Sequence, residues 1–354
     1  MIISRTPYRI SFFGGGSDYP QWYRSNGGQV LATSINKYCY ITCRYLPPFF
    51  EHRIQVVYSK IESHQTVDQI EHPAVREILK HLEIERGVEI HHDGDLPARS
   101  GMGSSSSFTV GLLHALYALK GYMPSKSQLA KEGIHIEQER LRETVGSQDQ
   151  ILAAHGGFNH ITFSSDEDIS VRPITLPTER VSELNNHLML FYTGLKRTAS
   201  DIAGSYVPGI EDRDSQLRVI METVDEGISI LNSDQDISRF GELLHQAWNA
   251  KSSMSSKVSN PHVDEIYNRA RSAGAVGGKL LGAGGGGFML LFVHPSQQAN
   301  VREELSRLIH VPFKFESAGS QIIFFDAEED YSDADQARAN QSLDAFQELA
   351  SSDV

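Results

Sequence analysis

The sequence predicts an α+β protein with two domains, and three observations carry that prediction. The chain has 354 residues, 40% of them hydrophobic, which is enough for a sizeable core and more than one domain usually contains. Strand-like runs and helical segments occur in both halves of the chain, and no repeat of roughly 20 to 50 residues is visible. The stretch TLPTERVSEL at 175–184 is polar and carries a proline, as a crossover between domains would. We therefore expect one domain at 1–180 and a second at 181–354.

In the first half, runs of β-branched and aromatic residues predict strands, and apolar residues at helical spacing predict helices. The expected strands lie at 30–32, 38–46, 54–58 and 88–92. The expected helices lie at 74–82, 107–120 and 126–142.

The second half repeats this mixture of elements. The expected strands lie at 187–194, 288–293 and 322–325. The expected helices lie near 198–206, 214–232 and 236–250, and at 261–273. From Asp326 onward the chain is acidic, which is typical of a solvated helix or a frayed tail.

The charge of the chain limits its partners. A formal net charge of −13 argues against a broad surface for nucleic acid or for an anionic membrane. The first residues, MIISRTPYRI, contain no apolar run long enough for a signal peptide, so we expect a cytoplasmic protein. Any anionic ligand must then be bound by local groups rather than by long-range attraction.

The stretch LPARSGMGSSSSFTVGLLHALYALKG, residues 96–121, joins a polar loop to an almost wholly apolar helix. Such a helix is buried, and its N-terminus directs unpaired backbone N–H groups and the positive end of its dipole at the loop. Gly101 and Gly103 let the backbone approach a phosphate closely, and serine hydroxyls can bond phosphate oxygens or Mg²⁺. We predict a phosphate site here, although no Walker A lysine follows the glycines. The alternative is a serine-rich helix start without a ligand.

A second glycine cluster, GAGGGG at 282–287, formally matches a dinucleotide-binding fingerprint. That fingerprint needs a strand before it and a helix after it, whereas a strand is expected after this cluster. We therefore interpret it as a turn whose backbone can approach a bulky neighbour, such as a nucleotide phosphate or the first glycine loop.

Two carboxylates stand in unusual places. The apolar stripe of one expected helix runs through Ala130, Ile134, Glu137 and Leu141. A carboxylate on such a face needs a cation or strong hydrogen-bond donors, and an internal ion pair with an arginine such as Arg9 is the alternative to a metal. Asp149 follows a glycine turn in VGSQDQ and could point into a cleft, although an ordinary helix N-cap is the better explanation of this residue on its own.

Taken together, three segments resemble the galactokinase, homoserine kinase, mevalonate kinase and phosphomevalonate kinase (GHMP) superfamily. They are RTPYRISFFGGGSDYP (5–20), PARSGMGSSSS (97–107) and LLGAGGGGFMLLFV (280–293), in the order that the family has them. The resemblance implies a two-domain fold, with an N-terminal domain like domain 2 of ribosomal protein S5 and a ferredoxin-like C-terminal domain. It also implies an active site in the cleft between these domains.

The resemblance assigns roles residue by residue. The ATP-phosphate loop would consist of Gly101, Met102, Gly103, Ser104, Ser105 and Ser106. Ser105 and Glu137 match the ligands of Mg²⁺, and Asp149 matches the catalytic aspartate, with Arg9 as the basic residue beside it. The sugar would contact Asp18, Gly15 and Gly16. The implied reaction is in-line phosphoryl transfer from MgATP to a sugar hydroxyl.

Two departures from the family pattern bear on the substrate. Ser106 stands where many relatives have alanine, and FFGGGSDYP replaces the GEHTDY of galactokinases, which puts galactose in doubt. The segments PYRISFFGGGSDYPQWY and GGQVLATSINKYCYI are most similar to D-glycero-D-manno-heptose 7-phosphate kinases. Their product, a heptose 1,7-bisphosphate, serves cell-surface polysaccharide synthesis. A kinase for an unphosphorylated sugar such as fucose or galactose, or a catalytically silent sugar sensor, remains an alternative.

The implied ligands are ATP, Mg²⁺ and a small sugar phosphate, with a homodimer left open. The phosphate of the sugar needs charge-assisted hydrogen bonds, because the chain as a whole is acidic. Lys196 and Arg197, in FYTGLKRTASDIAG, are expected beside a helix N-terminus and are our candidates for this phosphate. The alternative is a pair of solvated surface charges.

Overall fold

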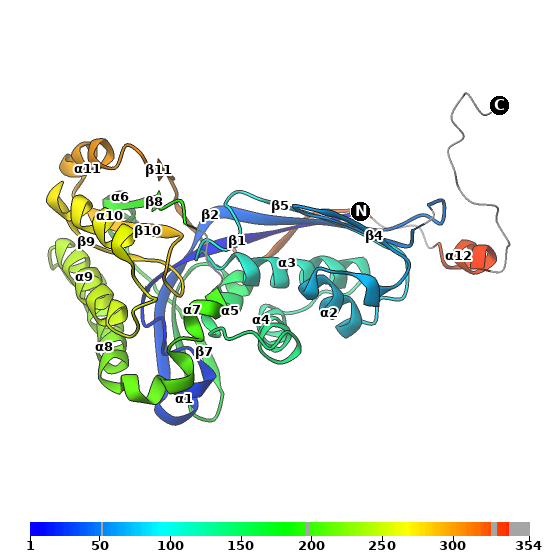
Figure 1. Ribbon diagram of the computed structural model, residues 1–354, viewed down its shortest axis with the longest axis horizontal. Helices are drawn as coiled ribbons and strands as arrows, with labels where there is room; N and C mark the ends of the chain where they lie inside the picture. Colours follow the sequence, from blue (N-terminus) through cyan, green and yellow to red (C-terminus); the bar gives the residue numbers. More distant parts are fainter. Residues whose placement is uncertain (51, 196–198, 327–330, 340–354) are drawn as a thin grey trace.

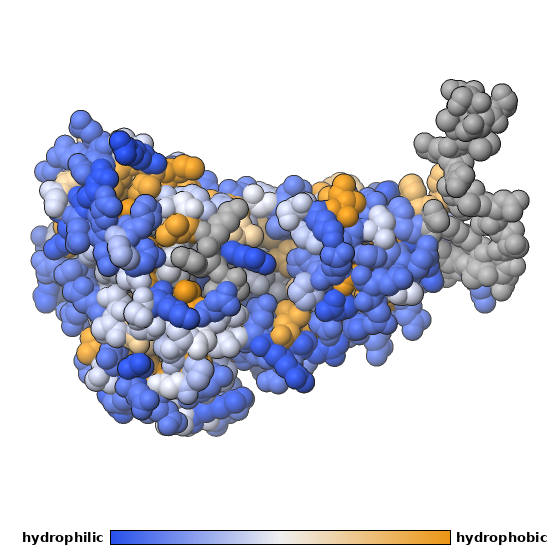
Figure 2. Space-filling model, viewed as in Figure 1, coloured by the Kyte–Doolittle hydropathy of each residue, from blue (hydrophilic) through white to orange (hydrophobic). Residues whose placement is uncertain are grey.

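Two β-sheets organise the chain, which we describe from a computed structural model. The structure describes residues 1–50, 52–195, 199–326 and 331–339. Helices and strands alternate in both halves, so the predicted α+β class is confirmed. None of the helices in these described ranges is long and apolar enough to cross a membrane. The face drawn in Figure 2 is largely hydrophilic, and its apolar residues lie in small separate groups.

The larger sheet is built around two long antiparallel strands, β1 (Ile2–Phe13) and β2 (Gly28–Tyr45). The other strands are β3 (Ile54–Val57), β4 (Ile61–His64), β5 (Val88–Gly94), β6 (Phe158–Phe163), β7 (Ile169–Pro173), β12 (Phe315–Glu316) and β13 (Gln321–Phe325). They run in the order β13-β1-β2-β5-β3-β4, while β6 and β12 also pair with β2, and β7 pairs with β6. The last two strands thus return to the sheet in which the chain begins.

Helices of the first half lie together along one side of the long strands (Figure 1). They are α2 (Pro73–His81), α3 (Ser104–Leu119), α4 (Lys126–His135) and α5 (Gln148–His155). Helix α1 (Pro20–Asn26) follows β1 and lies apart from them, at the bottom of the view. A 3-10 turn, η1 (Val67–Gln69), precedes α2, and a π-helical turn, η2 (Ile136–Arg140), continues α4. The apolar helix α3 is buried between β1, β2 and the helices α4 and α5, as its composition predicts.

The smaller sheet has the order β11-β8-β10-β9. Its strands are β8 (Leu188–Tyr192), β9 (Ala275–Leu280), β10 (Phe288–Val293) and β11 (Ile309–His310). The accompanying helices are α6 (Thr178–His187), α7 (Ala199–Ala203), α8 (Asp214–Leu231), α9 (Ser238–Ser252), α10 (Pro261–Ser272) and α11 (Gln298–Glu304). Helix α12 (Ser332–Ala339) follows β13 and lies away from this sheet (Figure 1). Two 3-10 turns are η3 (Val207–Arg213) and η4 (Pro295–Gln297). Helix α9 packs on β9, and α8 also contacts β2, which links the two sheets.

The structure contains elements that were not expected, namely the strands β4, β6, β7, β9, β11 and β12 and the helices α1, α5, α6 and α11. It also differs from the expected elements at the following places. The runs at 30–32 and 38–46 belong to the single strand β2, and β1 was not expected because arginine and proline interrupt its apolar residues. The helix expected at 126–142 is α-helical only to His135 and then widens into η2. The division at residue 180 and the homodimer stay predictions.

Candidate active site

The phosphate loop lies where α3 begins. Gly101 and Gly103 have φ values of +80° and +74°, a conformation that suits glycine, and Gly103 directly precedes the first turn of α3. A Cβ atom at Gly103 would lie 3.2 Å from Cγ of Arg9 and 3.4 Å from Oδ2 of Asp149. The loop backbone is therefore in contact with both residues that the resemblance placed at the reaction centre.

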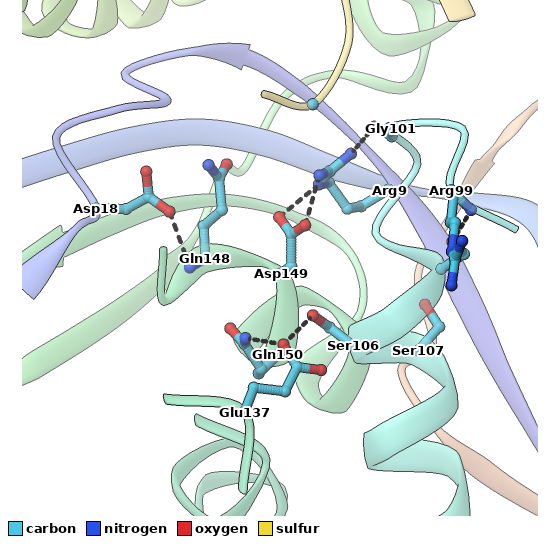
Figure 3. A network of polar contacts seen from close by, with 12 residues as sticks. Arg9, Asp18, Arg99, Gly101, Ser106, Ser107, Glu137, Gln148, Asp149 and Gln150 are labelled. Atoms are coloured by element: carbon cyan, nitrogen blue, oxygen red, sulfur yellow. Dashed lines mark hydrogen bonds and ion pairs between the residues drawn. The ribbon is translucent and has the colours of Figure 1, made fainter. Parts of the chain in front are cut away.

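Arg9 joins the aspartate to the loop (Figure 3). Its Nε and Nη2 donate to the two carboxylate oxygens of Asp149 at 2.6 and 2.5 Å, and its Nη1 donates to the Gly101 carbonyl at 2.7 Å. A bidentate pair of this kind fixes the orientation of a carboxylate as well as its position. The helix-cap alternative for Asp149 is therefore wrong, since α5 begins at Gln148 and the Asp149 side chain is held by Arg9.

Glu137 is fully buried in the turn η2 and lies on the other side of α5 from Asp18 (Figure 3). Its Oε2 accepts hydrogen bonds from the Ser106 hydroxyl at 2.9 Å and from Nε2 of Gln150 at 2.5 Å. Its Oε1 has no partner among the described residues. The alternative for Glu137, an ion pair with Arg9, is wrong, because Arg9 forms its ion pair with Asp149.

The surroundings of Glu137 fit a bound cation. Burial raises the pKa of Glu137 to about 8, so the charged form is costly unless a positive ion accompanies it. The unpartnered Oε1 and the nearby hydroxyl supply the hard oxygen ligands that Mg²⁺ prefers. The hydroxyl that reaches Glu137 is that of Ser106, while Ser105 is exposed at the start of α3. Ser105 as a metal ligand stays a prediction.

Asp18 closes the opposite side of the site. It is 1% exposed, and its carboxylate accepts hydrogen bonds from the backbone N–H of Gly16 at 2.9 Å and of Gln148 at 3.3 Å. Burial raises the pKa of Asp18. A Cβ atom at Gly146 would lie 1.9 Å from Oδ2 of Asp18, so only glycine fits there. The three residues expected at the sugar, Gly15, Gly16 and Asp18, therefore lie in one turn beside Asp149.

The second glycine turn packs on the first loop. A Cβ atom at Gly282 would lie 2.6 Å from Cα of Gly101, and one at Gly287 would lie 2.1 Å from the Ser100 carbonyl oxygen. The predicted close approach of the two glycine clusters is confirmed, and the dinucleotide fingerprint is not formed, because the strand β10 follows the turn.

Two buried lysines near the site escaped the sequence analysis. Lys251 donates to the Gly282 carbonyl, and Lys279 donates to the Phe12 carbonyl at 2.8 Å. Burial, with a smaller contribution from the positive charge of Arg9, lowers the pKa of Lys251 to about 8, while Asp18 and Asp149 act in the opposite direction. The sequence held a signal for Lys251: it continues the buried stripe of α9 at helical spacing, as Glu137 does in its helix.

Gln148 and Gln150 were also not singled out, although each is buried and flanks Asp149. Lys196 and Arg197 lie outside the described residues, between β8 and α7. Their assignment to the sugar phosphate stays a prediction.

Comparisons with known proteins identify the family of the chain. The family profile of the GHMP kinases N terminal domain matches residues 69–157, and that of the GHMP kinases C terminal domain matches residues 228–310. A D-glycero-alpha-D-manno-heptose 7-phosphate kinase of Campylobacter jejuni is 28% identical over 317 residues, covering 86% of this chain and 93% of the relative.

Solved structures share the fold. A D-glycero-D-manno-heptose 1-phosphate kinase of Bacteroides thetaiotaomicron superposes with a TM-score of 0.74 at 24% identity, covering 92% of this chain and 99% of the other. The galactokinase of Lactococcus lactis, solved with galactose, superposes with a TM-score of 0.70 at 17% identity, covering 90% and 94%. The two profiles, the relative and the shared two-domain fold together show that the chain belongs to the GHMP kinase family of ATP-dependent phosphotransferases with a hydroxyl acceptor.

Proposed function

We propose that the chain transfers the γ-phosphoryl group of ATP to the anomeric hydroxyl of a D-glycero-D-manno-heptose 7-phosphate. The observation that carries the phosphotransfer is the placement of Asp149, which Arg9 holds against the glycine loop and beside Asp18. The choice of acceptor is supported by the relative named for heptose 7-phosphate, which matches most of both chains. Gly15 and Gly16, in place of the Glu-His pair of galactokinases, also favour an acceptor other than galactose.

The nucleotide phosphates are assigned to the start of α3. Residues 101–106 offer backbone N–H groups and hydroxyls there, and the helix dipole adds positive charge. Glu137 would hold Mg²⁺ together with a hydroxyl of Ser105 or Ser106, and the bound ion would neutralise charge on the phosphates. Lys251 and Lys279 add two buried amino groups on the side of the second glycine turn.

The acceptor hydroxyl is assigned to Asp149. The carboxylate orients this hydroxyl and takes up its proton late in the transfer, when the bond to phosphorus is forming. Arg9 keeps the carboxylate in place for this step through two charge-assisted hydrogen bonds. A silent sugar sensor would need neither this pair nor the buried carboxylate of Glu137.

A coupled ADP-release assay with MgATP tests the proposal. The acceptors are heptose 7-phosphate, the same heptose without its phosphate, L-fucose, D-galactose and mevalonate, and phosphorus NMR locates the new phosphate. We expect the highest kcat/KM for heptose 7-phosphate, with phosphorylation at the anomeric position. A higher kcat/KM for an unphosphorylated sugar would overturn the acceptor, and turnover of none would favour the sensor.

A further inference from the structure

The side chain of Gln148 stands between the two carboxylates of the site. Figure 3 shows it rising from the start of α5 between Asp18 and Asp149. Gln148 is 9% exposed, and its backbone N–H already bonds the carboxylate of Asp18. Because its backbone is fixed in this way, the side-chain amide has little freedom to leave the site.

The amide of Gln148 is not satisfied within the protein. Its Oε1 is buried without a hydrogen-bond partner among the described residues, and so is the hydroxyl of Ser11 nearby. Both groups face Gly15: a Cβ atom there would lie 3.3 Å from Nε2 of Gln148 and 3.3 Å from Oγ of Ser11. Buried polar groups without a partner are costly and rare, so this arrangement indicates a ligand that completes their hydrogen bonds.

Gln148 lies on the side of the site that is assigned to the acceptor, away from the side that is assigned to the nucleotide. The glycine loop touches Asp149 through Gly103, and the metal-side groups Glu137 and Gln150 lie on another side of α5 (Figure 3). Gln148 is instead on the side of Asp18 and the glycines that follow β1. This side therefore offers a carboxylate acceptor next to an amide with both donors and an acceptor, which is the chemistry that binds neighbouring hydroxyl groups.

We propose that Gln148 is a specificity-determining residue of the acceptor site, whose amide bonds the hydroxyl on the carbon next to the anomeric carbon. This inference rests on the proposed function. The Gln148 side chain stands between Asp18 and Asp149 (Figure 3), so the group that its amide bonds lies beside the hydroxyl that reacts. Gly15 contributes by lacking a side chain, since a methyl group there would press on the amide.

The test compares Gln148→Met with the unmodified enzyme on heptose 7-phosphate and on its 2-deoxy analogue. We expect Gln148→Met to lower kcat/KM for the full acceptor by roughly tenfold or more, as loss of a hydrogen bond in a buried site does. The same variant should have little effect on the 2-deoxy analogue, and the KM for ATP should stay within about twofold. An equal loss on both acceptors would overturn the proposal.

Gln150→Met is the matched control, because Gln150 lies on the same helix and is also buried but bonds Glu137. We expect it to raise the Mg²⁺ concentration needed for half-maximal activity and not to discriminate between the two acceptors. If Gln148→Met fails to fold, Gly15→Ala provides the same comparison by displacing the amide. If Gln148→Met and Gly15→Ala both still prefer heptose 7-phosphate over its 2-deoxy analogue as strongly as the unmodified enzyme does, the role of Gln148 is refuted. Absence of turnover by the unmodified enzyme would refute the proposed function instead.

Discussion

Asp149 is the residue on which the proposed chemistry depends most directly. Its carboxylate is held at both oxygens by Arg9, so replacement by asparagine keeps the size of the side chain but removes the charge and the proton acceptor. We expect Asp149→Asn to lower kcat by about 10²-fold or more, the scale of positioned acid–base catalysis. The affinity for ATP should barely change. Steady-state kinetics and calorimetric titration with ATP check this, and near-normal turnover would exclude Asp149 as the base.

Glu137 gives a prediction on pH at the same scale. Its pKa rises from the ordinary 4.5 to about 8 on folding, so between these values the folded chain keeps a proton that the unfolded chain has lost. The free energy of unfolding in a chelating buffer should therefore fall as pH rises from about 5 to about 8. Glu137→Gln, which has no charge to bury, should flatten this fall. It should also raise the Mg²⁺ requirement of the kinase reaction.

Denaturant unfolding at several pH values, with chelator and again with excess Mg²⁺, measures both effects of Glu137. Excess Mg²⁺ should restore stability at about pH 8 in the unmodified protein and not in Glu137→Gln. If the two proteins show the same dependence on pH, the buried carboxylate is stabilised by the protein alone.

At the scale of single elements, the sequence predicted the features that local patterns determine, but not the contacts between side chains of different elements. The apolar composition of α3 and the glycines before it were enough to predict a buried helix with a phosphate loop at its start. The stripe of the next helix predicted that Glu137 is buried, but not the π-helical turn that carries it. One residue more per turn changes which side chains meet, and local sequence does not reveal that Ser106 rather than Ser105 contacts Glu137.

The start of α3 provides the test at this scale. Gly103 has a positive φ, and any side chain there would enter the contact between the loop, Arg9 and Asp149. We expect Gly103→Val to abolish measurable ATP binding, because a branched side chain strains this backbone and fills the space in front of the helix N-terminus. The Tm should fall only modestly, since the apolar face of α3 remains packed. Undiminished ATP affinity by calorimetry would place the phosphates elsewhere.

At the scale of the whole molecule, the site is made by pairings that no local pattern contains. Arg9 and Asp149 are 140 positions apart in the sequence. Strand β13, near the C-terminus, pairs with β1, near the N-terminus. Such contacts depend on how the sheets assemble. The stripe of α9 could have shown that Lys251 is buried, but no local pattern shows that Lys251 and Lys279 reach the site, which happens only once the second sheet packs on the first.

The contact between the two glycine turns tests this dependence. Gly282 has a φ of +74°, and a Cβ atom there would lie 2.6 Å from Cα of Gly101, a backbone atom that cannot rotate away. Gly121 has nearly the same φ, +72°, but a Cβ atom there meets nothing within 4 Å. Both alanine variants carry the same cost of a left-handed backbone, about 1–2 kcal/mol, so their difference isolates the effect of pushing the turns apart. We expect Gly121→Ala to lose only stability, with kcat and KM unchanged, whereas Gly282→Ala should lose ATP affinity and kcat together. Equal kinetics in the two variants would mean that the second turn does not hold the phosphate loop in place.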